Sequence, residues 1–453
     1  MNQNQLSRQI VAECGVINST LAGLKISAGT HPAGGWAVVA GASYISYGIK
    51  LAPNVHPRQI NDAIPKLDEE LSAVRRCACP VRLRSMPLAL EVDHPSPAAL
   101  HWEEAGVAFS RLPAGSALLG RTWDDSGALE EVWRPADSPH VLIAGTTNSG
   151  KSTLQLMALA SLMLSTSPAA LQVYLVDLKN EDLVRLAGFP HVAGCARDLA
   201  SAVSMVLQVA AIKDQRVAGG ELPAAAPSVV LAIDEFAEFA GQRDVIAAIN
   251  SLAAVGRSKR VHLFAATQKP LAEVLGTLAK ANFTTRLVGR VVDDKEAATA
   301  TGRYKSGAEF LPDKRGAFLR VEGTMHRFQA YLFDVAGVEH ARGLAVRRWA
   351  GASAILAAPP PAIFAGVTGN VSGDTAPAAP SRTVPPAVVA VFAEYADGEG
   401  LRRGGKAAAV RALAGDVAGG RAYQVAADEV DRLFGLWRGE SAAAPILKMA
   451  RGA

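Results

Sequence analysis

The sequence predicts an α/β protein built around a parallel sheet with helices on both faces. The first observation is a series of short apolar runs rich in β-branched residues, at 140–144, 173–176, 228–233 and 261–266. Such runs are typical of parallel strands that are buried on both faces. The second observation is that the segments between these runs are long enough for crossover helices. A third is the glycine-rich loop that joins the first run to a helical segment.

The composition is that of a globular chain with a substantial core. Hydrophobic residues make up 49% of the 453 residues and charged residues 19%, which allows two or three domains. The formal net charge of +4 neither requires nor excludes nucleic acid, because clustering on one face matters more than the total. The cysteines are Cys14, Cys77, Cys79 and Cys195. Their spacing supports neither a disulfide framework nor a zinc site, so we expect free thiols in a reducing compartment.

No integral membrane segment is expected. The most apolar stretches are Trp36–Ile45 and Thr153–Leu164, and both are shorter than the roughly 20 residues that span a bilayer. The first residues lack the basic region and apolar core of a signal peptide. We therefore expect a cytoplasmic protein.

Hydrophobic periodicity predicts a smaller α/β domain before the main one. Residues 44–51 alternate like a strand, 57–75 have helical spacing, and 81–92 are typical of one or two strands. The predicted organisation is an N-terminal extension (1–42), a small α/β domain (43–136), the parallel-sheet domain (137–340), a linker (341–386) and a C-terminal module (387–453). The linker is expected because the chain around 357–386 is rich in Ala, Pro and Gly. Helical spacing returns in 387–438, which predicts a small helical module.

The most specific motif is Gly145-Thr-Thr-Asn-Ser-Gly-Lys-Ser152, which matches G-x-x-x-x-G-K-[ST]. It lies between a predicted strand and a helix N-terminus, where backbone N–H groups and the helix dipole favour an anion. Lys151 is expected to contact the β- and γ-phosphates of ATP, and the Ser152 hydroxyl to ligate Mg²⁺. The predicted nucleotide-binding residues are Gly145, Thr146, Thr147, Asn148, Ser149, Gly150, Lys151, Ser152 and Thr153.

Polar side chains follow two further predicted strands. The run at 229–233 ends in Asp234 and Glu235, and the run at 261–266 ends in Thr267 and Gln268. We expect Asp234 to hold Mg²⁺ through its water shell and Glu235 to polarise the attacking water. An amide at the edge of the sheet could sense the γ-phosphate, which makes Gln268 a candidate catalytic residue. The turn at 177–179 is either a coupling site or a solvated turn.

Over 44–333 the chain resembles FtsK/SpoIIIE-type translocases of double-stranded DNA. The most specific stretches are 139–152, Ala266-Thr-Gln268 and Lys280-Ala-Asn-Phe-Thr-Thr-Arg286, with Gly307-Ala-Glu309 and Gly316 further on. Residues 46–95 resemble the smaller domain of that family, and 118–121 its connection to the motor. The sequence departs from the family at Leu178, where a proline is usual, and at Asn148, where a glycine is usual.

The resemblance implies a RecA-like P-loop core, a homo-hexameric ring and duplex DNA in its central hole. It also implies an arginine that reaches the γ-phosphate of a neighbouring subunit, with Arg257 as the first candidate and Arg286 and Arg290 as the second. Lys179 and Arg315 are candidate pore residues. The membrane-anchoring N-terminal region of the family is not found, which favours a mobile element, plasmid or phage setting.

Several alternatives stay open at the level of sequence. The C-terminal module could be a DNA-binding winged helix, because Arg402, Arg403, Lys406 and Arg411 are available for phosphates. It could equally be a helical bundle that binds a partner protein, since nearby acidic residues nearly cancel those charges. The chain as a whole could also be a packaging motor, or a recruitment protein gated by nucleotide and not driven by DNA.

Overall fold

The computed structural model describes residues 2–31, 38–85, 88–105, 109, 111–124, 127–268, 282–313, 316–350 and 430. The chain divides into two compact units, Met1–Pro360 and Pro361–Ala453. The predicted linker from residue 351 onward and the C-terminal module, apart from residue 430, lie outside the described residues. Arg315 also lies outside them. All described residues up to 350 belong to the first unit.

A ten-stranded sheet forms the centre of this unit, in the order β11-β10-β12-β13-β9-β14-β15-β16-β7-β8. Its strands are β7 (Ala117–Asp124), β8 (Gly127–Trp133), β9 (His140–Ala144), β10 (Leu171–Val176), β11 (Val192–Ala196), β12 (Ser228–Ile233), β13 (Val261–Thr267), β14 (Thr285–Val288), β15 (Ala317–Glu322) and β16 (Thr324–Ala330). Neighbours from β11 to β14 pair in parallel, whereas those from β14 to β8 pair antiparallel. The predicted fold class and the four predicted strands are confirmed.

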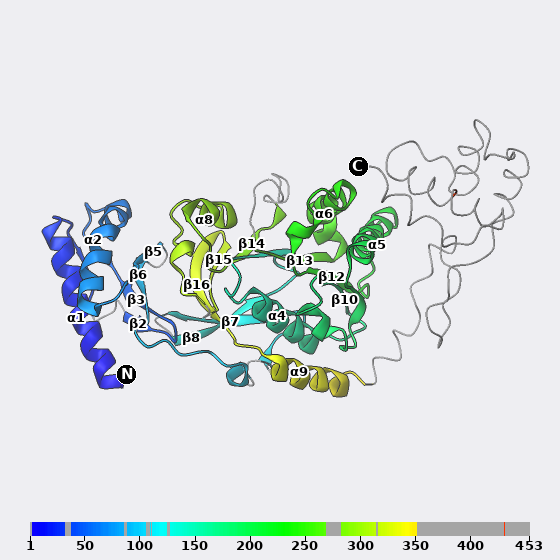
Figure 1. The fold of residues 1–453 in the computed structure, drawn as a ribbon, viewed down its shortest axis with the longest axis horizontal. Helices are drawn as coiled ribbons and strands as arrows, with labels where there is room; N and C mark the ends of the chain where they lie inside the picture. The colour runs from blue at the N-terminus through cyan, green and yellow to red at the C-terminus, as the bar shows by residue number, and fades with distance from the viewer. Residues whose placement is uncertain are drawn as a thin grey trace, which may run out of the picture. The chain divides into compact units, whose positions relative to one another are not determined.

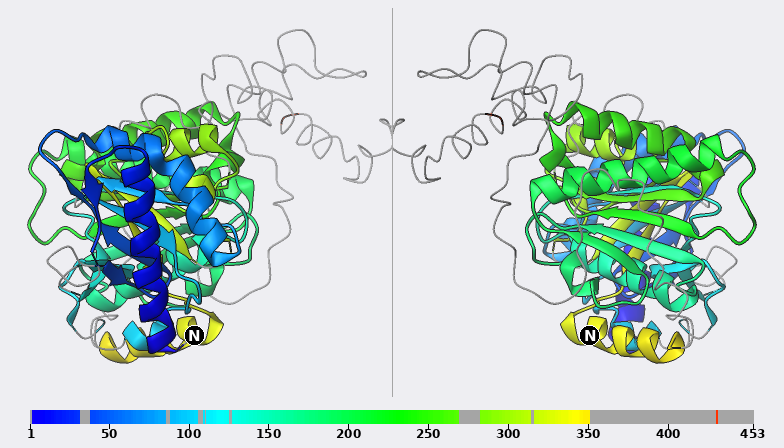
Figure 2. Two further views of the ribbon diagram at one scale, coloured as in Figure 1. Left: turned by 90° about the vertical axis from the view of Figure 1, so that its left-hand side faces the viewer. Right: turned by 90° about the vertical axis from the view of Figure 1, so that its right-hand side faces the viewer.

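Helices cover both faces of the parallel strands (Figures 1 and 2). They are α4 (Lys151–Ser165), α5 (Leu199–Ala218), α6 (Arg243–Val255), α8 (Asp294–Thr301) and α9 (Val335–Arg348), with 3-10 turns η1 (Trp102–Ala105), η2 (Leu183–Leu186), η3 (Phe236–Phe239), η4 (Gly256–Lys259) and η5 (Ala308–Phe310). Helices α4 and α9 pack with one set of core residues, and α5 and α6 with another. Helix α4 is buried on nearly all sides, as its uniformly apolar sequence requires.

The N-terminal part folds as a smaller α/β layer. Its antiparallel sheet has the order β2-β3-β6-β5, beside a two-stranded ribbon of β1 and β4. The elements are α1 (Gln3–Gly23), β1 (Ala28–Gly29), β2 (Val38–Ala40), β3 (Tyr44–Gly48), β4 (Lys50–Leu51), α2 (Pro57–Arg75), β5 (Arg82–Ser85) and β6 (Leu88–Asp93). Helix α1 falls within the segment expected as an extension, yet Ile17 and Leu21 are fully buried in the core that it shares with α2.

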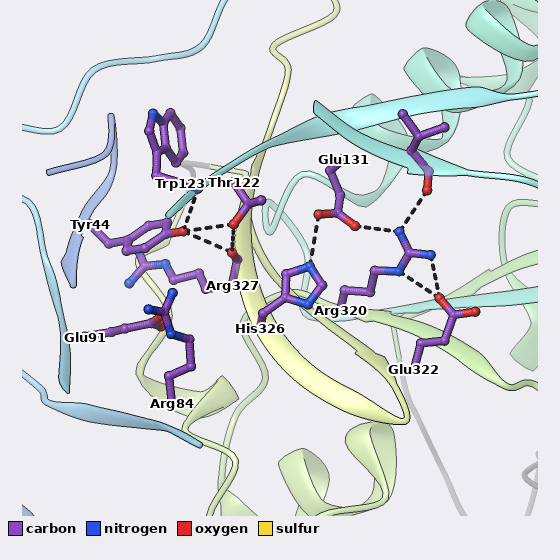
Figure 3. Close-up of polar contacts among 11 residues, drawn as sticks. Tyr44, Arg84, Glu91, Thr122, Trp123, Glu131, Arg320, Glu322, His326 and Arg327 are labelled. Carbon is purple, nitrogen blue, oxygen red and sulfur yellow. Dashed lines mark hydrogen bonds and ion pairs between the residues drawn. The ribbon is translucent and has the colours of Figure 1, made fainter. Parts of the chain in front are cut away.

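The hairpin β7–β8 lies within the segment expected as the small domain, but it forms one edge of the ten-stranded sheet. Strand β7 reaches β16 through Gly120, where a Cβ atom would stand 2.1 Å from the carbonyl oxygen of Gln329. The antiparallel part of the sheet is strongly curved, since side chains reach across it. Arg320 on β15 donates to Glu131 and to the carbonyl oxygen of Val132 on β8, across two intervening strands (Figure 3).

Within the part of the chain that the structure describes, we find no helix with both the length and the apolar character that crossing a bilayer would require.

Candidate nucleotide-binding site

The loop between β9 and α4 has the backbone of a phosphate-binding loop. Gly145, Asn148 and Gly150 all have positive φ, at 155°, 67° and 98°. At Gly145 a side chain would collide with the loop itself, because its Cβ would lie 2.7 Å from Ser149 Oγ. Asn148 is the non-glycine residue among the three, and asparagine adopts the left-handed conformation more readily than most residues. Asparagine is therefore compatible with the loop at this position.

Lys151 is the first residue of α4 and is buried. Its Nζ donates to the carbonyl oxygen of Thr146 at 2.9 Å, which holds the ammonium inside the loop. Burial lowers the pKa of Lys151 to about 8, although Glu235 and Asp234 oppose that shift. A buried ammonium group whose charge is only partly neutralised by its neighbours favours the binding of an anion.

The carboxyl ends of β12 and β13 bring the predicted carboxylates and amide close to this lysine, which comes after β9. Glu235 follows β12, and its Oε2 accepts from the backbone N–H of Gln268, which follows β13, at 3.0 Å. The side-chain Oε1 of Gln268 accepts from the Thr147 hydroxyl at 2.9 Å. A continuous hydrogen-bonded path therefore runs from Glu235 through Gln268 to the phosphate loop. Residues separated by more than 80 positions in the sequence meet here because parallel strands end at one edge of the sheet.

Asp234 has a raised pKa, about 6. Burial is the largest cause, followed by the charges of Asp177 and Asp182. Asp177 is fully buried after β10, and its Oδ2 accepts from the backbone N–H groups of Asp182 and Val184 at 3.0 Å each. Asp177 thus fixes the loop that brings Asp182 to the site. Asp177 could be found from the sequence because it directly follows a predicted strand. No pattern in the sequence singled out Asp182.

A cavity of about 800 Å³ lies at this edge of the sheet, and the predicted catalytic residue Glu235 is not among the residues that line it. The predicted residues Thr147, Asn148, Gly150, Lys151, Ser152, Thr153, Asp234 and Gln268 line it. Lys179, expected in the pore, lines it as well. Further lining residues were not found from the sequence: Ser43, Pro97, Ala98, Ala99, Leu100, Glu181, Asp182, Asp313, Gly316, Gln329, Ala330, Tyr331 and Leu332. Apart from Gly316, which belongs to a segment that resembles the FtsK/SpoIIIE family, they belong to segments without a recognisable motif, and only the chain's path through the sheet brings them here.

The three candidate arginines lie in different places. Arg257 is exposed in η4, at the edge where β12 and β13 begin, and lines a second cavity with Ser228 and His262. That edge is opposite the one that carries Lys151, so Arg257 does not reach the phosphate loop of its own chain. Arg286 is partly buried on β14. Arg290 is exposed, and its carbonyl oxygen accepts from the backbone N–H of Thr146 at 2.7 Å.

The donor set suits a divalent cation that is bound together with nucleotide. Among the described residues, no three His, Cys, Asp or Glu side chains form a metal site by themselves. Mg²⁺ in such sites takes few protein ligands and completes its shell with water and phosphate oxygens. Ser152 and Asp234 both line the cavity, and burial, followed by the charges of Asp177 and Asp182, raises the pKa of Asp234, so a nearby cation would stabilise its charged form.

We predict that ADP affinity falls as pH rises above about 8. Below its pKa of about 8 Lys151 is charged and attracts phosphate. Bound phosphate raises that pKa, so binding at higher pH takes up a proton, and the dissociation constant should increase roughly tenfold between about pH 7.5 and about pH 9.5. Calorimetric titrations in two buffers of different ionisation enthalpy would measure both the dissociation constant and the number of protons taken up on binding. The Lys151→Arg variant, whose charge does not titrate, is the control, and a pH-independent wild type would contradict the assignment.

Sheet topology, phosphate loop and converging carboxylates together define a P-loop ATPase core. Residues 117–219 match the model of the FtsK/SpoIIIE family, and several curated DNA translocases match over 191 to 213 residues of the chain. Over this segment the chain is similar to FtsK/SpoIIIE-type proteins.

Two relatives illustrate the extent of the match. DNA translocase FtsK of Borreliella burgdorferi is 30% identical over 209 residues, which cover 40% of this chain and 26% of the relative. DNA translocase SftA of Bacillus subtilis is 29% identical over 213 residues, covering 41% of this chain and 22% of the relative. The matched segment thus spans about a quarter of the length of these relatives.

A solved structure supports the fold. The pCW3 conjugation coupling protein TcpA, in a monomer form with ATPγS, superposes with a TM-score of 0.50 at 18% identity, covering 74% of this chain and 99% of that chain.

Proposed function

We propose that this protein is an ATP-driven translocase of double-stranded DNA that works as a homo-hexameric ring. The observation that carries the proposal is the convergence of Lys151, Asp234 and Gln268 on one cavity, with Glu235 hydrogen-bonded to Gln268, in a chain whose relatives at about 30% identity are named DNA translocases. A mobile element, plasmid or phage setting belongs to the same proposal. So does a cytoplasmic location.

Each residue at the site has a role in this proposal. Lys151 contacts the β- and γ-phosphates, and Ser152 and Asp234 hold Mg²⁺, which supplies charge neutralisation at the phosphates. Glu235 accepts a hydrogen bond from the attacking water and orients it toward the γ-phosphate. Because Gln268 is bonded to both Glu235 and Thr147, loss of the γ-phosphate would disturb it. Gln268 could therefore transmit hydrolysis to the segment that follows it.

Arg257 is proposed as the residue that acts on a neighbouring subunit. Its guanidinium is exposed at the edge of the sheet opposite its own phosphate loop, as a ring of head-to-tail subunits requires. The planar, always charged guanidinium suits the spread charge of the transferred phosphoryl group. Arg286 is a weaker candidate, because its Nε donates to the carbonyl oxygen of Phe283 within the same chain.

The test is steady-state ATP turnover with and without linear duplex DNA. We expect duplex to raise turnover at least about tenfold, and salt to weaken that stimulation because the grip is on phosphates. Lys151→Ala should show no turnover, whereas Arg257→Ala should bind nucleotide normally and lose the stimulated rate. Displacement of a DNA-bound triplex strand would then report movement. Turnover indifferent to duplex would refute the translocase and turn attention to packaging or recruitment.

A further inference from the structure

The lining of the nucleotide cavity is of two chemical kinds. Lys151, Asp234 and Gln268 are polar, and Lys179 and Asp182 add further charges. The apolar lining comes mostly from two segments, Pro97–Leu100 after β6 and Ala330–Leu332 at the end of β16, which we name the apolar wall. Leu332 leaves 45% of its surface exposed although it lines this cavity. Its exposed apolar surface is available for a ligand.

Backbone hydrogen bonds join the two segments of the apolar wall. The N–H of Leu332 donates to the carbonyl oxygen of Leu100 at 2.7 Å, and the N–H of Trp102 donates to that of Leu332 at 3.3 Å. Within the small layer, the N–H of Ala98 donates to the carbonyl oxygen of Ala42 at 2.9 Å. The small N-terminal layer therefore supplies part of the nucleotide cavity itself.

A partly buried ion cluster fixes this arrangement, with the Arg327 side chain fully buried and 27% of the Asp93 side chain exposed. Asp93, four residues before Pro97, accepts from Arg327 Nη1 at 2.7 Å and from Arg82 Nη2 at 2.6 Å. Arg327 lies two residues before Gln329 on β16, and its guanidinium also lies 4.9 Å from the centre of the Tyr44 ring. The Tyr44 hydroxyl donates to the carbonyl oxygen of Arg327 at 3.1 Å (Figure 3). Each segment of the apolar wall thus begins within four residues of one partner of the same ion pair.

We propose that the apolar wall receives the nucleobase of ATP, and that the Asp93–Arg327 pair positions it. This inference rests on the proposed function, because it requires the triphosphate to lie on the phosphate loop. With the phosphates at Lys151, the base is the part of the ligand that remains to be covered, and its flat faces suit apolar side chains. The volume of about 800 Å³ accommodates a whole nucleotide. The small layer is then part of the binding site as well as a neighbour of the motor.

The test compares ATP with inorganic tripolyphosphate, which has the phosphates and lacks the base. Leu332→Ser should weaken ATP binding about fivefold to tenfold and leave tripolyphosphate binding within about twofold. Ala99→Trp fills the cavity from an exposed position and should have the same selective effect. Leu129→Ser is the matched control, because Leu129 is 43% exposed on β8 and lies outside the cavity lining.

The positioning role of the ion pair has its own readout. Asp93→Asn should raise the KM for ATP while kcat and tripolyphosphate binding remain within about twofold. Equal weakening of both ligands by Leu332→Ser or Asp93→Asn would indicate a general structural effect and overturn the inference. Unchanged ATP binding in Leu332→Ser and Ala99→Trp would place the base elsewhere. Lys151→Ala distinguishes failure of this inference from failure of the proposed function. If Lys151→Ala binds both ATP and tripolyphosphate as the wild type does, the proposed function at the phosphate loop is refuted.

Discussion

Replacing Glu235 with Gln is expected to lower the kcat for ATP by about a hundredfold to a thousandfold while nucleotide affinity stays within about twofold. Glutamine keeps the shape of the side chain, and its carbonyl oxygen can still accept from the N–H of Gln268, which lies 3.0 Å from Oε2 of Glu235. The amide cannot polarise the attacking water as a carboxylate does. The variant should therefore accumulate in the ATP-bound state.

The measurement pairs single-turnover hydrolysis with an equilibrium binding titration. Glu238→Gln provides the matched control, because Glu238 is an exposed glutamate in η3, the 3-10 turn that Glu235 caps, three residues further along. We expect that control to retain full turnover. A Glu235→Gln variant with more than about a tenth of the wild-type kcat would show that another group activates the water.

The second large effect is on stability. Asp93→Ala should lower the free energy of unfolding by about 3–5 kcal/mol, because removing one partner of a buried ion pair leaves its counterpart uncompensated. Arg82 and Arg327 both donate to Asp93, and the Arg327 side chain is fully buried. Burial, and next the charge of Arg82, already lower the pKa of Arg327 to about 10. Without Asp93 these two cations would face each other in the interior.

Urea unfolding monitored by tryptophan fluorescence would measure this loss. Asp62→Ala is the control, an exposed aspartate on α2 that should change stability by less than about 0.5 kcal/mol. A change below about 1 kcal/mol in Asp93→Ala would show that the ion cluster contributes little to the docking of the small layer.

The pH dependence supplies a second measure of the same pair. Burial would raise the pKa of Asp93, but Arg82 and Arg327 outweigh it and hold the pKa below its ordinary value. A carboxyl whose pKa is lower in the folded state contributes stability above its unfolded pKa of about 3.9 and loses it as pH falls through the folded value. The difference in stability between wild type and Asp93→Ala should therefore shrink at acid pH.

The small layer marks the limit of what periodicity could predict. Residues 57–75 have a clear helical stripe, and α2 has those bounds. Helix α1 was not predicted because its buried side is narrow. Glu13, a charged residue, lies on that buried side. That carboxylate is stabilised inside the protein by Arg75 and Tyr47, so a charged residue occupies a position where the sequence offered no apolar signal.

The sequence by itself determined the parallel sheet, the phosphate loop and the carboxylates after β12. These features depend on short-range patterns: a buried strand needs a continuous apolar run, and a phosphate loop needs glycines and a lysine at fixed spacing. Tertiary structure alone decided which edge Arg257 occupies and how β7 and β8 extend the sheet. It also decided that Pro97–Leu100 and Ala330–Leu332 lie side by side in the lining of the nucleotide cavity. Contacts over more than 200 residues depend on the path of the chain through the sheet and on an ion pair such as Asp93–Arg327, for which no local pattern in the sequence exists.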